Sequence, residues 1–174
     1  LDKNDVISLA NKYKNCDILL TQFSYAAWTG KPTERSKRVE AVLSKENQIT
    51  IQAQVLKPKH IIPFASFIYF CHEENNYMND NPADLVQVTK LIKSFGIHPV
   101  VLYPGDKWDL INVKPSFEHN LSRYKRDIKN LFDQNLIKSN KIDYDEFIKY
   151  SKNYLEKIKK NNGKLLMFIF CFIS

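Results

Sequence analysis

The chain has 174 residues, of which 44% are hydrophobic and 13% aromatic, so it holds enough apolar material for the core of one domain. Its net charge of +7 does not indicate a nucleic-acid partner, because the basic residues are spread around helical segments and lack interleaved exposed aromatic residues or a reading motif. Three widely spaced cysteines form no C-x-x-C pair, which is typical of a cytoplasmic protein. No secretion signal is predicted. No membrane contact is predicted either, because the apolar run at 165–173 is shorter than the roughly 20 residues that cross a bilayer.

Helical and strand patterns alternate along the first part of the chain. The predicted elements are a helix over 5–15, a strand over 17–23, a helix over 34–56, a strand over 60–70, a helix over 82–96 and a strand over 98–103. Pro58 ends the second helix and Gly96 the third. This alternation predicts an α/β fold with strands covered on both faces. Beyond residue 114 the pattern changes to two helices, near 116–136 and 143–161, and then the apolar run, which is predicted to be a buried strand.

A polar cluster follows the second predicted strand at its carboxyl end. It consists of His72, Glu73, Glu74 and Asn75. In open α/β sheets ligands bind beyond the carboxyl ends of strands, so these side chains are candidates for a metal or substrate site. An ordinary loop is the other interpretation, and for His72 both stay open. His60, His98 and His119 lack metal-ligand spacing, and we expect structural or surface roles for them.

Two further carboxylates lie at expected turn or helix-cap positions. Asp106, just past Pro104-Gly105, is a candidate metal ligand or partner of a ligand, and equally a turn residue that caps its own backbone. Asp143 is expected to cap a helix together with Glu146, because Ile137 falls where a calcium loop needs an oxygen ligand. No Gly-rich phosphate loop is present, which argues against nucleotide binding of the Rossmann or P-loop kind.

Three stretches carry a family resemblance: CDILLTQFS at 16–24, LKPKHIIPFASFIYFCHEENNYMND at 56–80 and HPVVLYPGDKW at 98–108. Together they resemble the C-terminal half of a metallo-β-lactamase-fold protein. The branch that looks most similar contains the lactamase-fold domains of CMP-N-acetylneuraminate and UDP-N-acetylmuramate hydroxylases, and L-ascorbate-6-phosphate lactonase-like hydrolases are more distantly similar. The resemblance implies half of an αββα sandwich in βαβαβ order and hydrolysis of a small anionic metabolite by a hydroxide bound to a divalent metal (zinc, iron or manganese).

The resemblance also implies which parts of the fold this chain contains. Residues 1–113 correspond to the C-terminal half of the lactamase-like domain, and 114–174 form a helical extension. The family's H-x-H-x-D-H ligands are not in this sequence, and Ala65 stands where the last metal-binding histidine is usual. His72 and Asp106 are then the candidate metal ligands, and Glu73, Glu74 and Asn75 a substrate wall.

The alternatives come from other classes of protein. The chain is expected to be inactive without its N-terminal half, which is the expected partner besides a small-molecule substrate. A non-catalytic fragment or a binding module without the metal-ligand half is the main alternative. A flavodoxin-like binding domain ranks last, because it rests only on the βαβ alternation.

Overall fold

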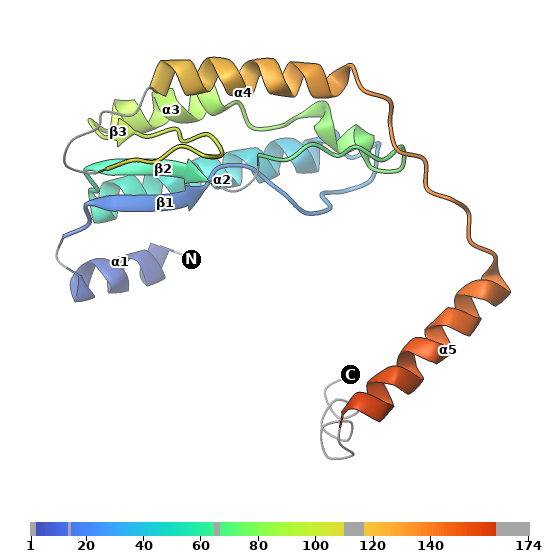
Figure 1. Cartoon of the computed structure of the whole chain (residues 1–174). Helices are drawn as coiled ribbons and strands as arrows, with labels where there is room; N and C mark the ends of the chain where they lie inside the picture. Colours follow the sequence, from blue (N-terminus) through green and yellow to red (C-terminus); the bar gives the residue numbers. More distant parts are fainter. Residues whose placement is uncertain (1–2, 14, 65–66, 110–116, 163–174) are drawn as a thin grey trace. The chain divides into compact units, whose positions relative to one another are not determined.

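The computed structural model describes residues 3–13, 15–64, 67–109 and 117–162, and the chain divides into two compact units, one up to Ile137 and one from Lys138. The first unit contains a three-stranded parallel sheet, and the described residues of the second contain one helix (Figure 1). The sequence-based boundary at 113/114 precedes α4 (Phe117–Phe132), which belongs to the first unit. Ala65 and the apolar run at 165–173 lie outside the described residues.

The sheet has the order β1-β2-β3, with β1 at Ile18–Gln22, β2 at His60–Phe64 and β3 at His98–Pro99. All described pairings are parallel, and Leu20 lies opposite Ile62. The α2 helix (Arg35–Leu56) connects β1 to β2, while the 3-10 helix η1 (Asn76–Asp80) and α3 (Leu85–Ser94) lie between β2 and β3. The predicted α/β class is therefore confirmed.

The ends of the crossover helices follow the punctuation in the sequence. Helix α2 ends where Lys57 adopts a left-handed φ of 46° immediately before Pro58. The Asp84 carboxylate caps α3 by accepting a hydrogen bond from the Val86 N–H at 2.8 Å. Gly96, with φ of 73°, ends the same helix in the left-handed conformation that glycine tolerates best.

One face of the sheet packs on the helices to form the core. Ile61 of β2 is fully buried with Ile49 of α2 and with Val88 and Ile92 of α3. Burial of each such side chain contributes about 1.5–3 kcal/mol relative to exposure. Helix α1 (Lys3–Lys12) and α4 complete the first unit, and Leu121 and Tyr124 of α4 pack against the core.

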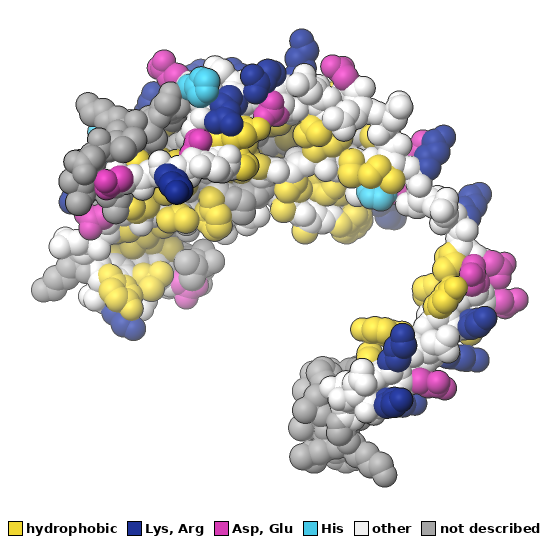
Figure 2. Space-filling view, in the orientation of Figure 1, with side chains coloured by type: hydrophobic (Ala, Val, Ile, Leu, Met, Phe, Trp, Pro, Cys, Tyr) yellow, Lys and Arg dark blue, Asp and Glu magenta, His cyan; other side chains and the backbone are white. Residues whose placement is uncertain are grey.

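The other face of the sheet carries exposed apolar side chains. Leu20 of β1 is 54% exposed and Phe64 of β2 is 45% exposed, whereas Ile62, the register partner of Leu20, is buried. Figure 2 shows apolar side chains at the surface of both units. Since parallel sheets normally have both faces covered, the exposure of these two residues marks a face that the described chain covers only in part.

Two strands are shorter than their apolar sequences predict. Strand β2 ends at Phe64 and does not continue to residue 70. The Asn79 side chain takes over the backbone pairing of Phe70: its amide donates to the Phe70 carbonyl at 2.8 Å, and its oxygen accepts from the Phe70 N–H at 3.0 Å. Strand β3 is short because the chain after Val100 turns towards Asp106, which accepts from the Tyr103 N–H at 3.0 Å.

The second unit contains α5 (Tyr144–Asn161). The Asp143 carboxylate accepts hydrogen bonds from the Asp145 and Glu146 N–H groups, so the predicted N-cap is confirmed. Within the described residues α5 buries no side chain, and Phe147 and Tyr154 are more than half exposed. In the part of the chain that the structure describes, no helix combines the length and apolar character needed to cross a bilayer.

Candidate functional site: a cavity at the carboxyl edge of the sheet

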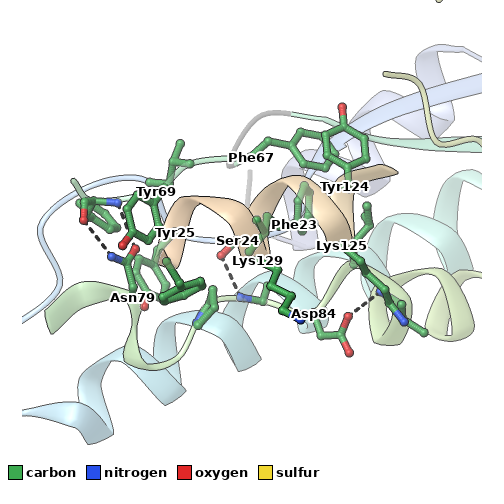
Figure 3. A pocket seen from close by; sticks show the side chains of 18 of the residues that line it. Phe23, Ser24, Tyr25, Phe67, Tyr69, Asn79, Asp84, Tyr124, Lys125 and Lys129 are labelled. Carbon is green, nitrogen blue, oxygen red and sulfur yellow. Dashed lines mark hydrogen bonds between the residues drawn. The ribbon is translucent and has the colours of Figure 1, made fainter. Parts of the chain in front are cut away.

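A cavity of about 420 Å³ opens where β1 and β2 end (Figure 3). Its walls come from four segments: the residues after β1, the residues after β2, the turn from η1 into α3, and one face of α4. Parallel strands that stop at the same edge leave their following loops side by side, which is why ligand sites form there. The volume lies in the range of pockets that hold small molecules, about 300–1,000 Å³.

Aromatic rings make up much of the wall. Phe23, which follows β1, packs edge-on against Phe67, with ring centroids 4.8 Å apart. Phe67 in turn stacks on Tyr124 of α4 at 4.2 Å and an interplanar angle of 9°. Tyr69 meets Phe132 of α4 edge-on at 5.1 Å. These contacts hold the segment after β2 against α4, although that segment is not a strand.

Three hydroxyl groups in the wall, those of Tyr25, Ser24 and Tyr124, are bonded within the protein. The Tyr25 hydroxyl donates to the Met78 carbonyl at 2.6 Å, and burial raises the pKa of this phenol. The Ser24 hydroxyl oxygen accepts from the Ala83 N–H at 3.3 Å. The Tyr124 hydroxyl donates to the Leu102 carbonyl at 2.8 Å. The inner wall is therefore apolar in character, because its hydroxyl groups face their own backbone partners.

A buried guanidinium fixes one side of the cavity. Arg38 of α2 is fully buried, and its Nε and Nη2 atoms each donate to the Asp80 carboxylate at 2.7 Å. The same side chain donates to the carbonyls of Thr29, Lys31 and Pro32. It thus ties the loop after β1 to η1, which carries the wall residues Met78 and Asn79, and it holds the pKa of Asp80 below its ordinary value.

The polar cluster after β2 forms a turn beside this wall. The His72 carbonyl accepts from the Asn75 and Asn76 N–H groups, and the Asn75 side chain accepts from the His72 N–H at 3.2 Å. His72 also pairs with Ile137 in an isolated bridge. None of His72, Glu73, Glu74 and Asn75 lines the cavity; the residues before and after them do.

Asp106 occupies a turn that joins the sheet to α4. Besides the Tyr103 N–H, its carboxylate accepts from Asn120 Nδ2 at 2.6 Å and lies 3.5 Å from Arg123. These donors hold the pKa of Asp106 below its usual value, the Tyr103 backbone contact most strongly. This geometry matches the turn interpretation, since the carboxylate oxygens are already used by the protein's own donors.

The described residues do not fit a catalytic metal centre. Such a site takes three or more positioned protein ligands. Within the described residues, no three His, Cys, Asp or Glu side chains gather closely enough to hold an ion. His60 and His98 lie opposite each other at the amino edge of the sheet, with ring centroids 5.8 Å apart, and Trp108 packs edge-on against His60. Burial chiefly, with His98 and Lys59, lowers the pKa of His60.

Comparison of the chain with protein-family models, with curated proteins and with solved structures finds no match. The class that the structure itself defines is an α/β protein with a small parallel sheet and an aromatic cavity at the carboxyl edge of that sheet. Any finer assignment rests on the residues of this chain.

Proposed function

We propose that this chain is the C-terminal half of a metallo-β-lactamase-fold, hydrolase-like protein, and that it supplies the wall against which a small anionic metabolite binds. The observation that carries the proposal is the cavity at the carboxyl edge of β1 and β2. It lies where α/β enzymes bind their ligands, and two of the three stretches that resemble this family, 16–24 and 56–80, contribute to its lining, together with α3 and α4.

The open face of the sheet supports the sandwich architecture. Helices cover one face, whereas Leu20 and Phe64 are exposed on the other. In an αββα sandwich a second sheet packs against this face, about 10 Å away. The N-terminal half of the fold would supply that sheet, so the exposed apolar residues are what one half alone should present.

The metal ligands of the proposed protein come from outside the described residues. Zinc, iron or manganese in this fold supplies a hydroxide nucleophile when bound. The present chain contributes binding and orientation: its cavity excludes water from the apolar part of a substrate, and the turn at His72–Asn75 borders the same edge. We place the protein in a reducing compartment, the cytoplasm, because Cys16 and Cys71 are free thiols in the described chain.

A second candidate function is a binding module with no chemistry of its own. The specific observation in its favour is that the cavity is walled by this chain alone, with Arg38 and Asn79 fixing its loops. Such a module would bind the same ligands and need no metal.

Extending the chain by the coding sequence upstream of Leu1 separates the two functions. The hydrolase proposal predicts an H-x-H-x-D-H stretch in that reading frame and cleavage of an activated phosphodiester or lactone by the extended protein with added zinc or manganese. The chain as given should not cleave either substrate. An extended protein that lacks these ligands, or that remains inactive with every metal, would leave the binding module as the function.

A further inference from the structure

We propose that the cavity selects an amphipathic organic anion: an apolar, ring-containing body held inside, and one carboxylate, phosphate or sulfonate held at the mouth by Lys125 and Lys129. This inference concerns the site of the proposed function and names its ligand class. It holds equally for the hydrolase and for the binding module.

The interior of the cavity selects the apolar body. Phe67 stacks on Tyr124 and meets Phe23 edge-on along one wall (Figure 3). Tyr69 and Phe132 meet edge-on at another part of the lining. The Tyr25 and Tyr124 hydroxyl groups donate to the protein's own backbone carbonyls, so a strongly polar ligand body would lose its hydration without gaining these groups as partners. Aromatic rings favour flat apolar groups, which they contact edge-on or in offset stacks.

The charges around the mouth select the anionic group. Helix α4 carries four cationic residues, and they fall into two pairs. The two arginines are matched with carboxylates, Arg123 with Asp106 and Arg126 with Asp127. Lys125 and Lys129 instead line the cavity, one helical turn apart, and neither has a carboxylate partner among the described residues.

One carboxylate also lines the cavity, and it is engaged elsewhere. Asp84 caps α3, where its Oδ1 atom accepts from the Val86 N–H. The lining therefore carries two positive charges against one negative charge. Because both lysines are exposed, they attract and orient an anionic group that keeps part of its hydration, and the contribution of each is modest.

Two matched fluorescent probes test the inference on the chain as it stands. The first, 8-anilinonaphthalene-1-sulfonate, has an aromatic body with an anionic group; the second, N-phenyl-1-naphthylamine, has the same body without it. Both should bind to the cavity with enhanced emission, and the sulfonate should bind more tightly. In the double variant Lys125→Ala/Lys129→Ala, sulfonate binding should weaken about three- to tenfold, the effect of two exposed ion pairs, while binding of the neutral probe stays the same.

A charge-matched control separates the site from general attraction to a basic protein. Lys90→Ala/Lys93→Ala on α3 removes the same charge from residues that do not line the cavity, and it should leave both dissociation constants unchanged. Equal losses in the two double variants would overturn the role of Lys125 and Lys129. So would a fall in the affinity of the neutral probe together with that of the sulfonate.

Filling the cavity locates the binding. Ala83→Phe places a ring in the lining and should abolish the binding of both probes, with folding checked by circular dichroism; Ile128→Trp serves if Ala83→Phe does not fold. Binding that neither filling variant reduces would refute the cavity as the site. Probe binding to this chain does not depend on metal ligands upstream of it. The proposed ligand class can therefore be refuted while the hydrolase proposal stands, and the reverse.

Discussion

Replacing Arg38 by alanine should destabilise the first unit by about 2–4 kcal/mol. Loss of one member of a buried ion pair costs about 3–5 kcal/mol. Here the Asp80 side chain is 33% exposed and can be rehydrated, which lowers the expected cost. Arg38 also donates to the carbonyls of Thr29, Lys31 and Pro32. These carbonyls lose their donor in the variant, which raises the expected loss of stability again.

The same helix offers a matched control. Arg35 is an exposed arginine on α2 that donates to the Asn81 side chain at 3.3 Å, so Arg35→Ala should change stability by less than about 0.5 kcal/mol. Arg38→Lys keeps the charge but loses the two-pronged geometry, and it should fall between the two. Urea denaturation followed by circular dichroism measures all three.

If Arg38→Ala and Arg35→Ala shift the urea midpoint equally, the buried guanidinium does not hold the loop after β1 to η1. Because Arg38 lowers the pKa of Asp80, the wild type should lose part of its stability as the pH falls below the ordinary aspartate range, and Arg38→Ala should lose less over that interval.

Three further predictions concern the turn, the sheet face and the amino edge of the sheet. Asp106→Ala should lower the urea midpoint of the chain, through loss of its bonds to Tyr103 and Asn120, without changing the metal content of the extended protein measured by plasma mass spectrometry; a loss of bound metal from that protein would restore the ligand hypothesis. Leu20→Thr/Phe64→Thr should reduce the self-association of the chain measured by light scattering, at little cost in stability. Unchanged self-association would mean that the chain does not associate through this face of the sheet. The lowered pKa of His60 means that the unfolded chain binds the proton more readily, so stability should fall as the pH drops below about 6.5, the ordinary histidine value. His60→Phe should flatten that decline in urea titrations between neutral and mildly acidic pH, and an unchanged slope would assign it to other groups.

Local rules predicted the helices well. Apolar spacing together with Pro58, Gly96 and Asp143 placed α2, α3 and α5 close to their observed bounds. These residues lie within a few positions of the helix ends that they determine. The helix ends can therefore be predicted from a single sequence.

Long-range partners account for what the sequence did not reveal. The backbone groups of Phe70 pair with the side chain of Asn79, nine residues further along the chain, and not with a neighbouring strand. The burial of Arg38 depends on Asp80, 42 residues away along the chain. An arginine inside a helical pattern normally indicates a solvated face, so nothing near it in the sequence marks a clamp.

The sequence indicated the edge of the sheet at which the candidate site lies, but not the residues that line it. The rule that ligands bind beyond the carboxyl ends of parallel strands pointed to the segment after β2, where the cavity lies. The sequence drew attention to the polar residues His72–Asn75, whereas the cavity is lined by the apolar residues on both sides of them and by α4. An amphipathic pattern predicts a helix at α4 but not the partner on which its face packs.

The most direct test of the proposed function is the metal content, by plasma mass spectrometry after dialysis, of this chain and of the chain extended by its upstream coding sequence. The account predicts no stoichiometric metal in the chain alone, in both wild type and His72→Ala, and stoichiometric zinc, iron or manganese in the extended protein. Metal bound by the chain alone and lost in His72→Ala, or an extended protein that binds none, would contradict it.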